Sequence, residues 1–255
     1  MNYGCKDLII VISGGTSGIG LATAKLLLAE GAQVFLLGRS EAKGRQALQL
    51  LQKTTAPGTV HFVPCDVTSK ESCGQAILQL EQLTGSKIIN ILVNSAGVYE
   101  EGSLEAMTDA DYTRIFDTNV KGTLLLTQAA LPYLRQGGAI VNIASDAGIS
   151  GNYGCPVYCA SKGAVVALTK ALALDLAPAI RVNCICPADV DTPLLEQQLQ
   201  ANGGSYSKED MAECYPLGRI GRAEEIAYVI CSVASPANSF MTGSIIAVDG
   251  GLTAK

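Results

Sequence analysis

The sequence contains no tryptophan, only one histidine and no pair of cysteines at Cys-x-x-Cys spacing. A hydrolase of the Ser-His-Asp type needs a histidine beside its serine, and the chain also lacks the Gly-x-Ser-x-Gly turn that often presents such a serine. A zinc site needs about four nitrogen or sulfur ligands. The nine cysteines are odd in number, and His61 is far in sequence from the close pairs, Cys155/Cys159 and Cys184/Cys186. We therefore predict no metal site, and thiols that pack as small apolar groups in a reducing compartment.

Long apolar runs and an excess of positive charge are also missing. The runs LIIVI (8–12) and TLLL (123–126) are far shorter than the roughly 18 residues that cross a bilayer. The first run begins almost at once and leads into a glycine-rich loop without a cleavage site, unlike a signal peptide. A net charge of −5 and a pI near 5.0 disfavour nucleic-acid binding. We expect a cytoplasmic protein with neither a nucleic-acid nor a membrane partner.

The chain does have a regular alternation of short apolar runs and helical stretches. Hydrophobic residues make up 48% and charged residues 16% of its 255 residues, which is the composition of a globular protein. The apolar runs lie at 8–12, 33–37, 60–64, 89–93, 139–144, 180–186 and 244–248. The helical stretches lie near 19–30, 41–53, 69–84, 109–116, 120–135, 157–176 and 223–233.

Near-continuous apolar strands are typical of a parallel sheet that is covered on both faces. The alternation therefore predicts an α/β, doubly wound Rossmann-type fold, in which helices flank a seven-stranded parallel sheet on both faces. No linker or internal repeat interrupts the pattern, so we expect residues 1–255 to form a single dinucleotide-binding domain. Such sheets bind ligands beyond the carboxyl ends of their strands.

A glycine-rich loop follows the first predicted strand. Gly14, Gly18 and Gly20 lie at Gly-x-x-x-Gly-x-Gly spacing before the first predicted helix. Glycines there allow a tight turn and let a pyrophosphate approach the helix N-terminus. The spacing differs from the usual Gly-x-Gly-x-x-Gly fingerprint, and a glycine turn alone could be only a tight turn. Its position between the first strand and the first helix favours a nucleotide.

The end of the second predicted strand bears on the choice of cofactor. An acidic residue there would bind the ribose 2′-hydroxyl of NAD, whereas an arginine accommodates the 2′-phosphate of NADP. The chain reads LLGRSE, which places Arg39 at this point and Ser40 as the cap of the next helix. We therefore predict NADP(H) rather than NAD(H). Arg39 could instead be a solvated surface residue, and Glu41 could weaken its field.

The chain places Tyr158 four residues before Lys162, which puts both side chains on one face of a helix. A tyrosine has a pKa near 10, so only about one in a thousand is ionised at pH 7. An ammonium group one helical turn away favours the phenolate by roughly 1–3 pKa units. The pair therefore predicts a proton carrier, with Ser145 at the end of the preceding strand holding the substrate oxygen. Taken alone, the same spacing could be an ordinary helix face.

A series of motifs occurs in the order typical of one family. The motifs are SGGTSGIG (13–20), NSAG (94–97), DTNVKG (117–122), NIASDAG (142–148), YCASK (158–162), PADVDTP (187–193) and VDGG (248–251). With them the chain resembles the classical short-chain dehydrogenase/reductase family over nearly its whole length. Three positions depart from the family pattern. Ser13 and Ser95 replace other polar residues, and Ala188 stands where the family has a glycine near the nicotinamide.

The resemblance implies an oxidoreductase that transfers a hydride between NADP(H) and a small-molecule carbonyl or secondary alcohol, with Tyr158 as general acid/base. It implies that the catalytic residues are Asn119, Ser145, Tyr158 and Lys162, with Asn119 holding a water that links Lys162 to solvent, and that Asp66 contacts the adenine. The predicted cofactor-binding residues are Gly14, Ser17, Gly18, Ile19, Gly20, Arg39, Ser40, Asp66, Val67, Asn94, Ala96, Gly97, Tyr158, Lys162, Pro187, Val190 and Thr192. It also implies a homotetramer or homodimer formed through the helices near 120–135 and 157–176.

Three alternatives remain open at this stage. The chain could be an NAD-dependent dehydrogenase of the same family, or a protein of the same fold that senses nicotinamide cofactors without turnover. Reduction of a carbon–carbon double bond is a weaker third alternative, because such reductases space their tyrosine and lysine farther apart than Tyr-x-x-x-Lys.

Substrate choice should lie in the segment 194–218, which we expect to act as a lid over the site, with a hinge at 202–204. An apolar wall of this lid would be formed by Leu194, Leu195, Leu199, Tyr206 and Met211, although these residues could equally pack on the domain. We expect Asp146, Asn152 and Tyr153 to face the same pocket.

Overall fold

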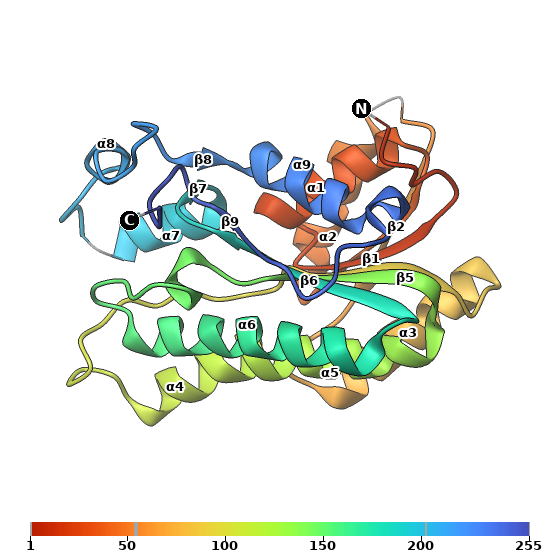
Figure 1. Cartoon of the computed structure of the whole chain (residues 1–255), viewed down its shortest axis with the longest axis horizontal. Coiled ribbons are helices and arrows are strands. Elements are labelled where there is room, and N and C mark those ends of the chain that lie inside the picture. The colour runs from red at the N-terminus through yellow and green to blue at the C-terminus, as the bar shows by residue number, and fades with distance from the viewer. Residues whose placement is uncertain (1, 54–55, 202, 255) are drawn as a thin grey trace.

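The computed structural model describes residues 2–53, 56–201 and 203–254, and its centre is one sheet of seven parallel strands (Figure 1). The strand order is β3-β2-β1-β4-β5-β6-β9. The strands are β1 (Ile9–Ser13), β2 (Gln33–Gly38), β3 (Thr59–Pro64), β4 (Ile89–Asn94), β5 (Leu134–Ile143), β6 (Ile180–Pro187) and β9 (Ile245–Val248). The order reverses between β3-β2-β1 and β4-β5-β6, as in a doubly wound sheet. The predicted fold class is confirmed.

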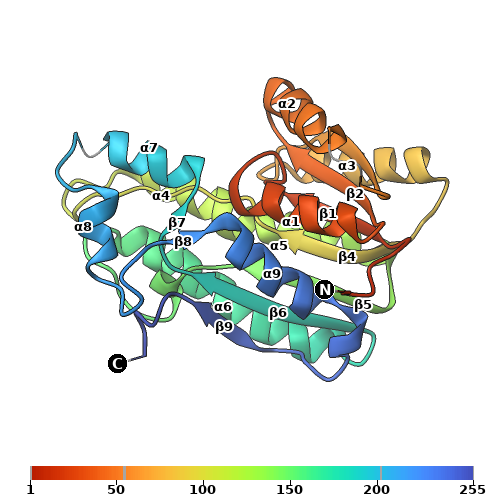
Figure 2. The same cartoon turned by 90° about the horizontal axis from the view of Figure 1, so that it is seen from above.

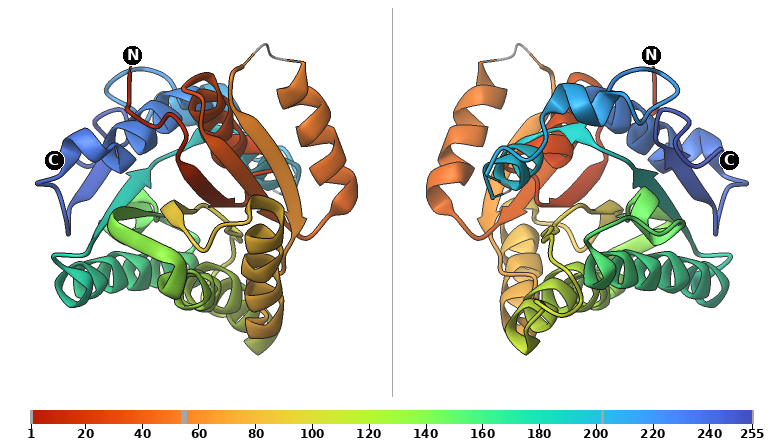
Figure 3. Two further views of the ribbon diagram at one scale, coloured as in Figure 1. Left: turned by 90° about the vertical axis from the view of Figure 1, so that its right-hand side faces the viewer. Right: turned by 90° about the vertical axis from the view of Figure 1, so that its left-hand side faces the viewer.

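Helices cover both faces of this sheet, as the end-on views in Figure 3 show. They are α1 (Gly18–Ala29), α2 (Glu41–Gln52), α3 (Lys70–Thr84), α4 (Asp109–Phe116), α5 (Gly122–Ala130), α6 (Pro156–Leu176), α7 (Pro193–Ala201), α8 (Lys208–Ala212) and α9 (Ala223–Ala234). A π-helical turn, Asp117–Lys121, joins α4 to α5. A small second sheet pairs β7 (Val190–Asp191) with β8 (Gly221–Arg222), and it lies with α7 and α8 at one end of the molecule (Figures 1 and 2).

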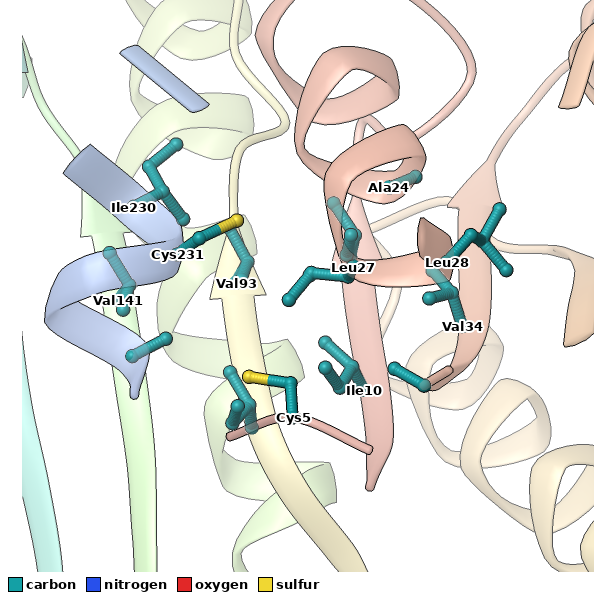
Figure 4. Packing of buried hydrophobic residues seen from close by; sticks show 14 of the residues in the cluster. Cys5, Ile10, Ala24, Leu27, Leu28, Val34, Val93, Val141, Ile230 and Cys231 are labelled. Carbon is teal, nitrogen blue, oxygen red and sulfur yellow. The ribbon is translucent and has the colours of Figure 1, made fainter. Parts of the chain in front are cut away.

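Alternation along the strands supplies two hydrophobic cores. In β1, Ile10 and Ile12 pack in the core beneath α1 and α9, whereas Val11 points to the opposite core beneath α3, α5 and α6. Figure 4 shows the first core, where Leu27 of α1 and Ile230 of α9 lie over the strands. Each fully buried aliphatic side chain contributes about 1.5–3 kcal/mol relative to exposure. Both faces of the sheet therefore need a helical cover, and this is why the strands read as continuous apolar runs.

One predicted boundary is wrong. The helix predicted to run to residue 135 ends at Ala130 and is followed by a 3₁₀ turn, Leu131–Tyr133. Pro132 explains the end, because proline has no N–H for the α-helical hydrogen bond and its ring clashes with the preceding turn. Strand β5 consequently begins at Leu134, five residues before the predicted start.

Helix α6 is, among the residues that the structure describes, the one helix that is long and apolar enough to cross a membrane. It nevertheless packs on the sheet and buries polar side chains, including Ser161, Lys162 and Thr169. Thr169 Oγ1 accepts a hydrogen bond from Asn142 of β5 at 2.9 Å, and the Asn142 side chain in turn accepts one from Asn94 of β4 at 2.8 Å. The apolar character of α6 therefore reflects its position against the core of the sheet.

The last strand and the last helix are fastened to β6. Residues 184–187 of β6 pair in register with β9. The guanidinium of Arg181, also in β6, donates four hydrogen bonds of 3.0–3.2 Å to carbonyls at the end of α9 and beyond it. Arg181 is buried, and its donors satisfy carbonyl groups that the end of a helix leaves without partners. One side chain thus holds the C-terminal elements against the sheet.

Candidate active site

A cleft of about 1470 Å³ lies at the carboxyl ends of the strands. The loops that follow β1, β2, β3, β4, β5 and β6 all contribute to its lining, and residues of α7 and α8, with Tyr206 between them, border the other side. Parallel strands bring these loops to one edge of the sheet, so residues far apart in sequence meet there. The cleft can therefore be divided into two parts. One half is lined by the loops after β1, β2 and β3, and the other half is bordered by residues of α7 and α8.

The glycine loop turns tightly before α1 and packs closely against neighbouring backbone. Gly14 and Gly18 have φ angles of +65° and +50°, a region that favours glycine. A Cβ at Gly14 would lie 2.8 Å from the backbone oxygen of Ser95, and a Cβ at Gly20 would lie 2.5 Å from that of Gly14. Within the described residues, the side chain of Ser17 makes no capping hydrogen bond to α1, so the first amides of this helix face the cleft without that cap. This arrangement fits a pyrophosphate.

A basic region follows β2. Arg39, Ser40 and Lys43 line the cleft beside the start of α2. Ser40 caps this helix by accepting a hydrogen bond from the Lys43 amide at 3.3 Å. Glu41, which could have weakened the positive field, pairs with Arg45 at 3.1 Å on the exposed side of the helix. Two cations and a helix N-terminus thus face one part of the cleft, where a phosphate group would be stabilised.

The predicted catalytic side chains converge at the middle of the cleft. Ser145 follows β5, and Tyr158 and Lys162 lie on the first turns of α6; all three are buried and line the cleft. The Lys162 ammonium lies 5.7 Å from the centre of the Tyr158 ring and donates a 3.0 Å hydrogen bond to the backbone oxygen of Ile143. Tyr99 packs edge-on against Tyr158, with ring centres 4.8 Å apart. The pair is therefore held in place on several sides.

The pKa of Tyr158 is raised rather than lowered, so burial outweighs the predicted influence of Lys162. Burial raises the pKa of Tyr158 well above its ordinary value, and the carboxylates of Asp146 and Asp189 add to the rise. A hydrogen bond donated by the Ser145 hydroxyl to the phenolic oxygen lowers the pKa of Tyr158, but this effect is smaller than that of burial. The ammonium sits against the ring and is hydrogen-bonded elsewhere, while desolvation penalises the phenolate. The phenol is therefore protonated at neutral pH.

Burial also acts on the lysine. It lowers the pKa of Lys162 from 10.5 to about 8, because the charged ammonium is removed from water. Lys162 is 5% exposed, and it is still mainly protonated at pH 7. An added Cβ at Gly97 would lie 3.4 Å from the Lys162 Nζ and 3.3 Å from the Asn119 Oδ1. The backbone of the loop after β4 therefore passes close to both the Lys162 ammonium and the Asn119 side chain.

Most of the predicted cofactor and catalytic residues line the cleft. Three of them, Gly20, Asn94 and Asn119, do not. Gly20 packs against Gly14, and Asn94 is held inside the sheet by Asn142 and Thr127. Asn119 lies in the π-helical turn, where it accepts from the Val98 amide at 2.8 Å and donates to the Val98 carbonyl and to Ser161 at 3.0 Å. These three residues support the cleft from behind, and no spacing in the sequence distinguishes them from the residues that line it.

The other half of the cleft is bordered by the predicted lid. Four of the five predicted apolar residues line it, and Leu199 does not. Tyr206 lies within 2.7 Å of the Gln198 amide and donates to Glu101 on the opposite side at 2.8 Å. Gly203 and Gly204 have positive φ angles, whereas Asn202 of the predicted hinge lies outside the described residues. The hydrogen bonds between Gln198, Tyr206 and Glu101 thus connect the lid to the loop after β4.

Sequence reasoning missed several residues of this half. Tyr215 donates a 2.5 Å hydrogen bond to Asp189, which follows β6, across 26 residues of chain.

Asp146 and Asn152 were expected at the pocket and do line it, and their side chains are hydrogen-bonded at 3.0 Å. Tyr153 is also at its edge but is fully exposed. Among the described residues no group of three or more histidine, cysteine or acidic side chains is placed to hold a metal ion.

Comparison with known proteins finds similarity to reductases and dehydrogenases over nearly the whole chain. A family model described as enoyl-(acyl carrier protein) reductase matches residues 14–253. A 2-(S)-hydroxypropyl-CoM dehydrogenase of Xanthobacter autotrophicus is 38% identical over 260 residues, which cover 100% of both chains. A 3-oxoacyl-(acyl-carrier-protein) reductase of Thermotoga maritima is 35% identical over 96% of this chain and 97% of its own length. The structure of an aldohexose dehydrogenase from Thermoplasma acidophilum superimposes with a TM-score of 0.88 at 32% identity, covering 100% of this chain and 97% of that one.

Proposed function

Because the chain belongs to the classical short-chain dehydrogenase/reductase family, whose members act on alcohols and carbonyls with a nicotinamide cofactor, we propose that it transfers a hydride between NADP(H) and a secondary alcohol or its ketone. We further propose that Tyr158 is the general acid/base. The observation that supports this most is the buried phenol of Tyr158 in the cleft, with Ser145 and Lys162 beside it. In its bound state the cofactor would supply or accept the hydride.

The side chains divide the remaining work. Tyr158 carries a proton at neutral pH, so it can donate that proton to a carbonyl oxygen as the carbon is reduced. For alcohol oxidation the phenol must first lose the proton, and a charged Lys162 nearby favours that loss electrostatically. Ser145 contacts the same substrate oxygen. Lys162 is held against Ile143, and Asn119 fixes the loop at Val98 on which the cleft depends.

The proposed cofactor-binding residues are those predicted from the sequence that line the cleft, with Lys43 added. Arg39 and Lys43 flank the N-terminus of α2, and this favours a ligand with a 2′-phosphate. The predicted role of Arg39 is tested by Arg39→Ala. We expect it to raise the KM for NADPH at least tenfold and to leave the KM for NADH nearly unchanged, since only the former offers a phosphate to the guanidinium. Equal effects on both cofactors would contradict the assignment.

The substrate half of the cleft favours uncharged molecules. Its lining includes Glu101, Asp146 and Asp189, which disfavour an anionic group beside the reacting carbon. Relatives named cyclopentanol dehydrogenase (Comamonas testosteroni) and meso-2,3-butanediol dehydrogenase (Serratia marcescens) are 36% and 35% identical to this chain. We propose a small neutral alcohol or diol as substrate. Reduction of a carbon–carbon double bond is the second candidate, favoured by the description of the matching family model.

One substrate panel tests both candidates. Cyclopentanol, 2,3-butanediol, their ketones and an enoyl thioester are followed at 340 nm with both nicotinamides. Turnover of the alcohol and ketone pairs supports the proposal, and turnover of the enoyl thioester alone would favour carbon–carbon double-bond reduction instead.

Tyr158→Phe is expected to abolish turnover while cofactor binding persists. Tyr153→Phe is the matched control, because that tyrosine is at the edge of the same cleft but fully exposed. A fully active Tyr158→Phe enzyme would reject the mechanism, and cofactor binding without any turnover would favour the sensing alternative.

We propose that residues 1–255 act as one domain whose 194–218 segment closes over the substrate.

The outer face of α6 carries exposed small and apolar residues, such as Ala160, Ala167 and Leu174, and Leu124 of α5 is also exposed. This face supports the proposal of a homotetramer or homodimer formed through α5 and α6. Light scattering coupled to size exclusion tests it. All nine cysteines are free thiols, which supports a reducing, cytoplasmic location.

A further inference from the structure

Two cysteines that the mechanism above does not use lie on either side of Tyr158 in the sequence. Cys155 comes directly before α6, and Cys159 lies one helical turn into that helix. Their sulfur atoms are 3.7 Å apart. Cys155 is 2% exposed and lines the cleft, whereas Cys159 is partly exposed. One thiol of the pair is therefore at the reaction centre, and the other can be reached from solvent.

The backbone at these two positions allows a bond between the sulfurs. The Cα atoms of residues four apart in a helix are about 6 Å from each other, and disulfides span roughly 4.4–6.8 Å between Cα atoms. Cys155 itself lies outside the regular helix, with a φ of −143° and a ψ of 50°. Its side chain can therefore turn toward Cys159 without unwinding α6, and the sulfurs can close to the bonded distance of about 2 Å.

A displacement of the Cys155 sulfur reaches both the catalytic tyrosine and the lid. Cys155 packs in one cluster with Tyr158, and its thiol interacts with the Tyr99 hydroxyl. The Tyr99 ring packs edge-on against the ring of Tyr158. The Tyr99 hydroxyl also lies 3.4 Å from the Glu101 carboxylate, to which Tyr206 of the lid donates. A sulfur that moves toward its partner thiol therefore withdraws a contact from Tyr99 and loosens the packing around the phenol.

We propose that Cys155 and Cys159 are a redox-modification site, whose reversible disulfide switches off turnover at Tyr158. The oxidant is hydrogen peroxide. The Cys159 thiolate attacks one peroxide oxygen and the O–O bond breaks, which gives a sulfenic acid and a hydroxide that takes up the thiol proton as water. The Cys155 sulfur then displaces the hydroxyl group from Cys159, and this group leaves with the Cys155 proton as a second water.

The two thiols thus lose two electrons and two protons, and the peroxide is reduced to water. A dithiol such as dithiothreitol reverses the bond by thiol–disulfide exchange. A transient disulfide of this kind suits a reducing compartment, where structural disulfides do not persist. The loss of turnover rests on the proposed function, whereas formation of the disulfide does not.

Two other pairs of neighbouring thiols must be separated from this one. The sulfurs of Cys184 and Cys186 in β6 are 3.9 Å apart. Cys65, which lines the cofactor half of the cleft, interacts with Cys73. All four of these side chains are buried, and of the six paired thiols Cys159 alone is not. Reactivity of a thiol requires access as well as a thiolate, so the pair at α6 should be oxidised first.

The experiment uses the full chain with Cys214→Ser, which removes an exposed thiol that has no part in the proposal. The reduced protein is treated with hydrogen peroxide, alkylated and digested with trypsin. Peptide 136–162 contains Cys155 and Cys159 and no other cysteine, so mass spectrometry detects their bridge as the loss of both thiol hydrogens. We expect the bridge to form while kcat falls about tenfold or more, because the groups around the phenol are displaced. Dithiothreitol should restore kcat, and the Kd for NADPH should stay within about twofold, since its half of the cleft is not involved.

Cys159→Ser is the matched control, because a hydroxyl can still accept from the Asn152 amide that donates to the Cys159 sulfur but cannot form the bridge. It should be active when reduced and keep its activity in peroxide. Should it not fold, Cys159→Ala gives the same comparison. The inference is overturned if peptide 136–162 forms no bridge, if the bridge forms while kcat stays within about twofold, or if the control is inactivated as strongly as the parent.

A reduced parent that turns over no substrate would instead reject the proposed function. The switch is then read from hydrogen exchange at the Gly102 amide, which donates to the Gly154 carbonyl at 2.7 Å directly before Cys155. Faster exchange of this amide in the bridged protein supports a displacement at the site. Unchanged exchange in the bridged protein overturns it.

Discussion

Lys162→Met should make this protein more stable while removing its activity. Burial lowers the pKa of Lys162 from 10.5 to about 8, so holding the charged form in the folded state at pH 7 costs about 3 kcal/mol. A methionine of similar length removes that cost. It also removes the hydrogen bond to the Ile143 carbonyl, a loss of about 1 kcal/mol. The free energy of unfolding at pH 7 should therefore rise by roughly 2 kcal/mol, which corresponds to about 5 °C in Tm.

The pH dependence of this gain identifies its cause. Below pH 8 both the folded and the unfolded lysine are protonated, and the wild-type protein bears the full cost. As the pH rises toward 10.5, the unfolded lysine also loses its proton and the cost disappears. At pH 9.5 about half of it remains, so the gain of the variant should fall below about 1 kcal/mol.

Urea unfolding of both proteins at pH 7 and 9.5 measures the difference, and other titrating groups cancel in the comparison. Lys170→Met is the matched control, because Lys170 lies on the same helix but is exposed, and it should change stability by less than about 0.5 kcal/mol at either pH. A Lys162→Met protein that is less stable than the wild type at pH 7, or whose gain does not shrink with pH, would refute the reasoning.

Three further outcomes are expected. Arg181→Lys should lower the free energy of unfolding by about 2–3 kcal/mol in urea titrations, since an ammonium cannot bond four carbonyls in the geometry of the guanidinium; an unchanged midpoint would contradict this. Gly14→Ala should weaken NADPH binding at least tenfold in fluorescence titrations, because its Cβ would lie 2.8 Å from a backbone oxygen; Gly74→Ala, where a Cβ meets nothing within 4 Å, is the control. Native alkylation followed by mass spectrometry should label the exposed Cys214 well before the buried Cys155, since burial raises the pKa of Cys155 to about 12; labelling of Cys155 as early as Cys214 would show that the cleft is open there.

The sheet could be predicted from the sequence because each of its strands is a short apolar run between helical stretches. The end of α5 was missed although Pro132 marks it, since the apolar pattern continues beyond the proline into β5. The π-helical turn at Asp117–Lys121 could not be predicted from the sequence. The residues that form such a turn are the same types that form an ordinary α-helix, so no residue marks it. Element types therefore follow from patterning, and local departures from regular geometry do not.

In the candidate site, too, some residues could be predicted from the sequence and others could not. Ser145, Tyr158 and Lys162 could be brought together from the sequence because each lies at or just beyond a strand end, and the topology joins those ends. Asn94 could not be separated from the cleft residues, since only the packed structure shows that β5 and α5 hold its side chain. The raised pKa of Tyr158 was missed for the same reason, because desolvation depends on burial rather than on spacing.

The pairing of β9 with β6 has a consequence for synthesis of the chain. Strand β6 is buried along its whole length, yet the neighbour that covers its outer edge is encoded some sixty residues later, almost at the C-terminus. Until Val248 has left the ribosome, the nascent sheet presents a row of unpaired amides and carbonyls flanked by aliphatic side chains, a surface that recruits strands from other molecules. Polypeptides released before Ile245 should accordingly be found in inclusion bodies, whereas loss of the few residues after Gly251 should leave the sheet closed.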